Sequence, residues 1–138
     1  MTDLGRSFRD AGAFFYKIPD MPHLPGAARF DTEKPFDAFA VYAHRRFAIE
    51  AKALDGYQAF GLRHLRHCQE VGLNDFDRSG GESWVFVLVE LPSEQRLIML
   101  PWHTVRDRAH SLKKVQMEAK PYLKRAKGRY EVGEWLKS

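Results

Sequence analysis

The chain has 138 residues, of which 44% are hydrophobic and 13% aromatic, enough to bury the core of one domain. Charged residues make up 29% of it, and no apolar run approaches the roughly 18 residues of a membrane span. The first residues include Asp3, Arg6 and Arg9 without an apolar stretch, so we expect no signal peptide. The single cysteine, Cys68, excludes a disulfide framework and a CxxC zinc site. We therefore expect an intracellular, cytoplasmic protein. Association with the nucleoid, or a virus-encoded protein in a host cell, would both fit this expectation.

The net charge of +4 is unevenly distributed along the chain. Residues 1–102 hold 12 Lys and Arg against 14 Asp and Glu, a net of −2, whereas residues 103–138 hold 10 against 4, a net of +6. A basic segment beside a near-neutral body is typical of a protein that binds a polyanion, of which nucleic acid is the commonest. A solvated helix with surplus lysines would show the same imbalance, so charge alone leaves both interpretations open.

Hydrophobic periodicity predicts the elements of the first half. Residues 3–11 are expected to form a short helix with Leu4 and Phe8 on one side, and residues 13–18 a strand. Residues 19–35 contain four prolines and are predicted to be a long loop. Residues 36–42 and 45–54 are predicted to form a hairpin, although neither residue of its two-residue turn favours positive φ.

The second half predicts two further strands between helices. Residues 58–73 are expected to form one helix, and residues 83–91 and 95–100 two strands, the first apolar enough to be central. Thr104 with Asp107 predicts the start of a helix that Pro121 interrupts, so residues 103–138 are expected to be a basic helical segment. This order predicts an α/β fold in which one mixed sheet has helices on its faces, in a single domain spanning residues 1–138.

The hairpin carries the residues with the clearest chemistry. If Tyr42 pairs with Arg45, Asp37 lies opposite Glu50 with the two Cβ atoms about 5 Å apart. Strand alternation places Lys52 on the same face as Glu50. The other face of the second strand is apolar and is predicted to be the packed side: Phe47, Ile49, Ala51 and Ala53.

Two carboxylates this close repel by roughly 3 kcal/mol at an effective dielectric constant near 20. A fold tolerates them if one is protonated, if solvent screens them, or if a cation lies between them. A divalent cation would take oxygen ligands from both and leave room for water and a phosphate. Lys52 can then orient the water or neutralise charge on the phosphorus oxygens. These are the parts of a site that hydrolyses phosphodiesters, and the alternative is a surface hairpin with an ordinary Glu–Lys pair.

Gln69 lies within the apolar stripe of the predicted helix 58–73, and a buried amide must find a hydrogen-bond partner. It either reaches the sheet and holds a metal ligand or bound water beside the carboxylates, or it is a satisfied core glutamine. Arg63, Arg66 and His67 on the other side of that helix form a predicted phosphate-contact row. His64 and His67 lack a third ligand for zinc and are expected to be solvated.

These residues resemble a known nuclease family. Phe36-Asp37 followed by Glu50-Ala51-Lys52 resembles the PD-(D/E)xK nuclease signature. With Phe60-Gly61-Leu62 and His67-Cys68-Gln69, the similarity is closer to RecU-type Holliday junction resolvases, over roughly residues 12–110. The resemblance implies a restriction-endonuclease-like fold in which Asp37, Glu50 and Gln69 bind Mg²⁺ and Lys52 stabilises the transition state. Pro35 stands where that family typically has a metal-binding threonine.

We therefore predict a Mg²⁺-dependent, structure-selective endodeoxyribonuclease that resolves four-way DNA junctions in recombination or replication, with Mn²⁺ as a substitute metal and the Ala51 carbonyl as a further ligand. Two symmetric nicks in a junction imply a homodimer. The residues expected to contact DNA are Lys17, Arg63, Arg66, His67, Lys113, Lys114, Lys120, Lys124 and Arg125. Two alternatives stay open: a less selective nuclease of the same fold acting on flaps, ends or duplex DNA, and a catalytically silent DNA-binding or assembly module.

Overall fold

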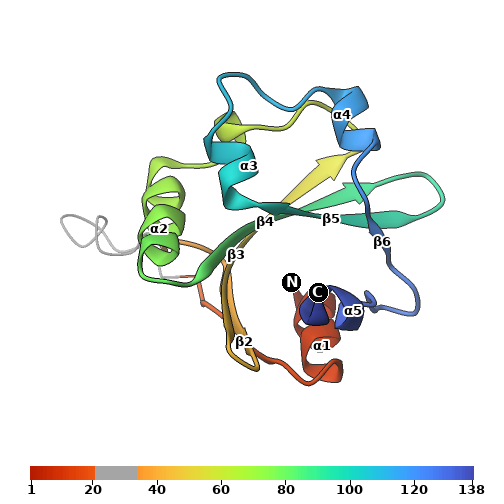
Figure 1. The fold of residues 1–138 in the computed structure, drawn as a ribbon. Coiled ribbons are helices and arrows are strands. Elements are labelled where there is room, and N and C mark those ends of the chain that lie inside the picture. The colour runs from red at the N-terminus through yellow and green to blue at the C-terminus, as the bar shows by residue number, and fades with distance from the viewer. Residues whose placement is uncertain (21–33) are drawn as a thin grey trace.

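A computed structural model describes residues 1–20 and 34–138, which form one six-stranded sheet with helices on both faces (Figure 1). In chain order the elements are α1 (Thr2–Asp10), β1 (Phe14–Lys17), β2 (Ala38–Tyr42), β3 (Arg45–Asp55), the 3₁₀ turn η2 (Leu62–His64), α2 (His67–Arg78), β4 (Glu82–Glu90), β5 (Gln95–Pro101), α3 (Trp102–Arg106), α4 (Lys114–Glu118), β6 (Leu123–Lys124) and α5 (Gly133–Lys137). No helix of the described residues is long and apolar enough to span a bilayer. The loop predicted over 19–35 lies mostly outside the described residues.

The sheet is mixed, as predicted. Its strands follow the chain order from β1 to β6, and all neighbours are antiparallel except β3 and β4, which are parallel. Parallel neighbours need a crossover connection, which α2 provides here. The apolar run of β4 is buried at the centre of the sheet, with Val85, Phe86 and Val87 fully enclosed.

Both faces of the sheet are packed (Figure 1). One core lies under α2, α3 and α4 and includes Leu73, Trp102 and Met117. The other lies against α1 and α5, beside which the two chain ends meet, and includes Phe8, Phe47 and Leu136. The prediction that one side of β3 alone is packed is therefore wrong. Ala53 on that side is exposed, whereas Ala48 and Leu54 on the Glu50 side are buried, because α2 covers the Glu50 side.

The hairpin forms in the predicted register, with Tyr42 opposite Arg45. Its turn uses Ala43 at a φ of 53°, a left-handed conformation that residues other than glycine adopt at some cost. The pairing of the strands on both sides therefore outweighs the poor turn residues.

The predicted helix over 58–73 is wrong at both ends. Phe60 instead forms an isolated β-bridge with Leu112, with N–O distances of 2.9 and 2.7 Å. α2 then begins at His67, where the Gln69 side chain accepts a hydrogen bond from the Arg66 N–H and caps the helix. A bridge to a residue more than fifty positions away is invisible to local periodicity. The helical part over 67–73 is confirmed, with Gln69 and Leu73 on its buried side.

The basic C-terminal segment is not the predicted helix opening at Thr104. α3 begins at Trp102 and is five residues long, α4 is equally short, and β6 and α5 follow. The segment is fixed in extended form where Leu112 pairs with Phe60 and where Leu123 pairs with Leu97. These long-range pairings override the local helical pattern.

Candidate active site

Asp37 is fixed between β1 and β3 by main-chain bonds. Its N–H donates to the Ile49 carbonyl at 3.0 Å, and its carbonyl accepts from the Ile18 N–H at 2.8 Å. Its side-chain Oδ2 accepts the N–H of Ala51 at 2.8 Å. The aspartate therefore sits at the end of the β2–β3 ladder, beside Glu50.

Glu50 is 1% exposed, and its two carboxylate oxygens differ. Oε2 lies 3.1 Å from the Lys52 Nζ, whereas the buried Oε1 has no hydrogen-bond partner among the described residues. Burial raises the pKa of Glu50 to about 7, and the nearby Asp37 charge raises it too, against the opposing effect of Lys52. The protein thus keeps a desolvated carboxyl group with one buried oxygen that has no hydrogen-bond partner among the described residues.

Lys52 is held by two partners on different elements. Its Nζ lies 3.1 Å from the Glu50 Oε2 and donates to the Gln69 Oε1, also at 3.1 Å. The same amide oxygen accepts the Arg66 N–H at 2.9 Å, so the residue that caps α2 also orients the lysine. Gln69 does reach the sheet beside the carboxylates, as one sequence interpretation predicted. Its oxygen already accepts two hydrogen bonds, one of them from the Lys52 ammonium group, which favours positioning of Lys52 over metal binding.

Lys34 belongs to this cluster, and the sequence interpretation missed it. Its Nζ lies 3.2 Å from the Asp37 Oδ1 and 2.7 Å from the Asp20 Oδ1. The segment carrying it rests on α2, because Pro35 packs where a side chain on Gly72 would stand: a Cβ there would lie 2.3 Å from the Pro35 Cβ. The (i, i+3) spacing of Lys34 and Asp37 was the available signal, and it sat in a segment interpreted as loop.

The donor set fits a hard divalent cation but not zinc. No three His, Cys, Asp or Glu side chains in the described part of the chain cluster as a metal site. Mg²⁺ needs only one or two carboxylates, because water and substrate oxygens complete its shell. Glu50, with its unpartnered Oε1, and the neighbouring Asp37 supply two. His64 instead stacks on Phe60 at 4.6 Å, and burial lowers its pKa.

Part of the predicted DNA-binding set lies around these residues. Arg66 and His67 are exposed at the start of α2, directly before Gln69, and Arg63 is exposed in η2. Lys113 and Lys114 are exposed next to Leu112, which bridges to the strand-like segment at Phe60. Lys17, also exposed, ends β1 opposite Ala38. Five of these residues form a basic margin on the α2 side of the sheet: Arg63, Arg66, His67, Lys113 and Lys114. Lys17 shares its face of β1 with Phe15, which packs against α1, so it lies on the opposite face.

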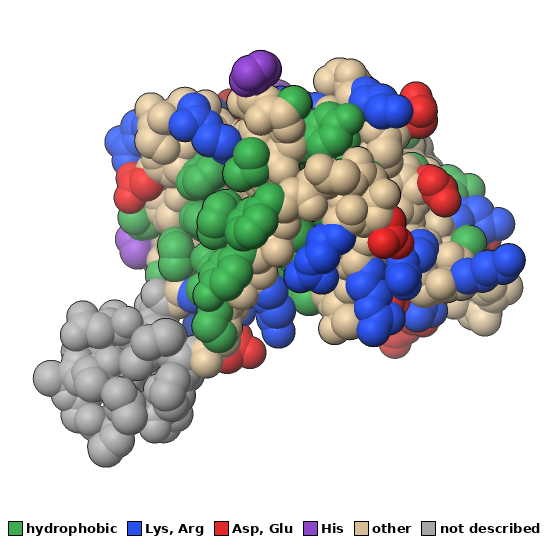
Figure 2. All heavy atoms as spheres, turned by 90° about the horizontal axis from the view of Figure 1, so that it is seen from below, with side chains coloured by type: hydrophobic (Ala, Val, Ile, Leu, Met, Phe, Trp, Pro, Cys, Tyr) green, Lys and Arg blue, Asp and Glu red, His purple; other side chains and the backbone are tan. Residues whose placement is uncertain are grey.

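The structure does not bring the remaining predicted DNA contacts to this margin. Lys124 and Arg125 lie in and after β6, which is separated from β3 by β4 and β5. Arg125 pairs with Asp3 of α1 at 2.7 Å, and Lys120 lines an apolar pocket with Trp84 and Trp135. Seen from the α1 and α5 side, Lys and Arg side chains stand among Asp and Glu, beside an apolar strip (Figure 2). The basic side chains of the C-terminal segment therefore do not form one continuous DNA-binding surface.

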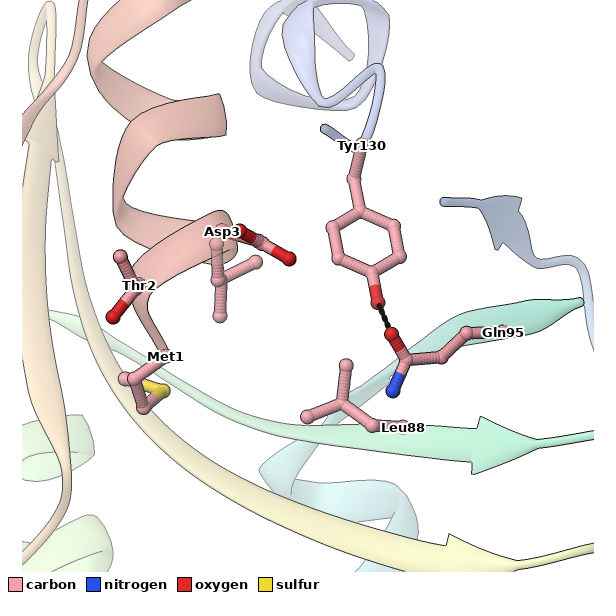
Figure 3. Close-up of a pocket in the computed structure, with 7 residues that line it drawn as sticks. Met1, Thr2, Asp3, Leu88, Gln95 and Tyr130 are labelled. Carbon is pink, nitrogen blue, oxygen red and sulfur yellow. Dashed lines mark hydrogen bonds between the residues drawn. The ribbon is translucent and has the colours of Figure 1, made fainter. Parts of the chain in front are cut away.

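A separate cavity of about 240 Å³ opens on the opposite face, between α1 and the β4–β5 hairpin (Figure 3). The Tyr130 hydroxyl donates to the Gln95 Oε1 at 2.9 Å across it. Its carboxylate, Asp3, is neutralised by Arg125. Paired polar groups of this kind give the cavity no evident chemistry, so the reactive groups gather on the α2 side.

The fold is similar to that of a solved structure. The structure of Hjc, a Holliday junction resolvase from the archaeal hyperthermophile Archaeoglobus fulgidus, matches with a TM-score of 0.61. The match covers 98% of this chain and 95% of that chain, at 16% sequence identity. No family model matches the chain, and no curated protein matches its sequence. The likeness confirms the predicted fold class, a mixed sheet flanked by helices.

Proposed function

We propose that this protein is a metal-dependent endodeoxyribonuclease that cuts branched DNA, with four-way junctions as its substrate. The observation that carries the proposal is the buried Glu50 beside Asp37, with Oε1 left without a partner among the described residues while Lys52 contacts the other oxygen. A buried carboxylate oxygen without a hydrogen-bond partner costs folding free energy. Such a group is expected where a bound ligand supplies the missing partner. The shared fold with an archaeal Holliday junction resolvase supports the choice of substrate.

Asp37 and Glu50 would hold Mg²⁺, or Mn²⁺ in its place, and the Ala51 carbonyl would be a further ligand. The divalent ion, when bound, supplies charge neutralisation at the phosphate and lowers the pKa of water. Lys52 donates to Gln69 as well as contacting Glu50, so its ammonium group has a second anchor from which it would neutralise charge developing on phosphoryl oxygens. Gln69 is thus assigned as a positioning residue, in place of the metal ligand implied by the sequence resemblance.

The basic margin would bind the phosphates around the cut. These side chains are exposed and lie on the α2 side of the sheet, where Glu50 and Lys52 also lie. Lys17, Lys120, Lys124 and Arg125 are left out of this role, because they lie away from the margin. Resolution of a junction requires two symmetric nicks, so we propose that two copies of the chain act together as a homodimer.

The test compares a four-way junction with a linear duplex of the same sequence, in Mg²⁺ or Mn²⁺. The wild-type protein should cut the junction, and Glu50→Ala and Lys52→Met should cut it at least about a hundredfold more slowly while still binding it. Lys137→Met, an exposed charge on α5, is the matched control and should cut normally.

Three other outcomes separate the alternatives. Comparable cutting of junction and duplex would remove the junction preference and leave a general nuclease. Junction binding by a wild-type protein that never cuts would point to the silent binding module. Full activity in both Glu50→Ala and Lys52→Met would show that the active site is elsewhere.

A further inference from the structure

Lys34 is enclosed by oxygen atoms on three sides. Its ammonium group lies 3.2 Å from the Asp37 Oδ1, 2.7 Å from the Asp20 Oδ1 and 3.4 Å from the Ile18 carbonyl oxygen. An ammonium group has three N–H donors, so each has an acceptor. The Lys34 side chain is 12% exposed, against 79% for Asp20. This lysine is therefore a built-in part of the cluster and not a solvated surface charge.

The backbone that carries Lys34 is held in place. Pro35 contacts Gly72 of α2 without room for a side chain between them, and Phe36 is buried against Phe76 with ring centroids 5.5 Å apart. Because the two residues that follow it are packed against α2, Lys34 is anchored on that side, and its side chain can change partners by rotation.

The two oxygens of Asp37 are both occupied in this arrangement. Oδ2 accepts the Ala51 N–H, and Oδ1 faces Lys34. A divalent cation that binds Asp37 would therefore meet a positive charge already on that carboxylate, and like charges at such distances repel strongly when solvent is limited.

We propose that Lys34 is an internal counter-cation that competes with the divalent ion for Asp37, and that Asp20 weakens this competition by holding the ammonium group on its far side. The inference rests on the proposed function, because it concerns the metal of the same site. It assigns opposite effects to two adjacent residues: Lys34 lowers metal affinity, and Asp20 raises it by giving Lys34 a second partner. If Lys34 instead only stabilised the structure of the site, its presence would raise metal affinity.

The test measures Mn²⁺ binding to the whole protein without DNA, by electron paramagnetic resonance of the free ion. Lys34→Met should bind Mn²⁺ more tightly by on the order of tenfold, below the unscreened interaction because the Asp20 side is open to solvent. Asp20→Asn should bind it more weakly by about threefold. The double variant should match Lys34→Met, because Asp20 acts through the lysine. Lys137→Met removes a charge from α5 and should bind like the wild type.

The outcomes distinguish this inference from the proposed function. If the wild type binds Mn²⁺ and Lys34→Met binds it equally or more weakly, the competition is refuted and the nuclease site stands. An Asp20→Asn effect that persists in the double variant would show that Asp20 acts directly on the metal, which also refutes it. If neither the wild type nor Lys34→Met binds Mn²⁺, both the metal site and the competition are wrong.

Discussion

Replacing Glu50 by glutamine should stabilise the metal-free protein at neutral pH, although it removes a proposed metal ligand. Glutamine has nearly the same shape, keeps an oxygen acceptor for Lys52 and carries no charge into the core. The wild-type carboxyl group is 1% exposed and has a pKa of about 7, against 4.5 for an ordinary glutamate. Its ionised form is therefore disfavoured in the folded protein.

The sign and size of the effect follow from proton linkage. Below pH 4.5 Glu50 is protonated in both states and costs nothing. Between pH 4.5 and about 7 the unfolded chain releases this proton and the folded protein retains it, so stability falls as pH rises. Each unit of pKa corresponds to about 1.4 kcal/mol, so the loss reaches about 3 kcal/mol above pH 7.

Urea unfolding in EDTA, from pH 4.5 to 8 at constant ionic strength, measures this pH dependence of the free energy of unfolding. Glu50→Gln should lack that part of the slope and should be more stable than the wild type at pH 7.5 by up to about 3 kcal/mol. Glu118→Gln, an exposed carboxylate on α4, is the control and should keep the wild-type slope. If the Glu50→Gln and wild-type curves run parallel across this range, Glu50 is not held in the desolvated state described above.

Two further predictions use matched pairs of variants. Arg66→Ala, in the basic margin, should weaken junction binding by about threefold to tenfold and lower the salt dependence of that binding. Arg125→Ala should leave junction binding unchanged, because Arg125 is paired with Asp3 of α1. Fluorescence anisotropy at several salt concentrations measures both. Gly72→Ala should destabilise the protein by about 1–3 kcal/mol in urea unfolding and slow cleavage, because the new methyl group displaces Pro35 and the segment leading to the site. Gly133→Ala has open space around its new Cβ and should change unfolding free energy by less than about 1 kcal/mol. Equal effects in the two glycine variants would contradict the close-packing argument.

Much of the fold could be predicted because its strongest signals are local. The strands at 45–55, 82–90 and 95–101 are long, apolar and bounded by short turns, and the structure has them within one residue of the predicted ends. The helices failed where a distant partner decided the conformation. Phe60 is extended because Leu112 bridges to it, and the basic C-terminal segment is divided because it returns to the sheet at Leu97.

For the site, the sequence by itself determined that Asp37, Glu50 and Lys52 meet on one hairpin, because a tight turn and the twofold period of strands leave little freedom over such short separations. The burial of Gln69 followed in the same way from helical spacing. Only the tertiary structure decided that α2 covers Glu50 and raises its pKa, that Lys34 faces Asp37, and that Arg125 forms an ion pair with Asp3. Desolvation and long-range ion pairing depend on what the rest of the chain packs against a side chain, and no local pattern of residues records that.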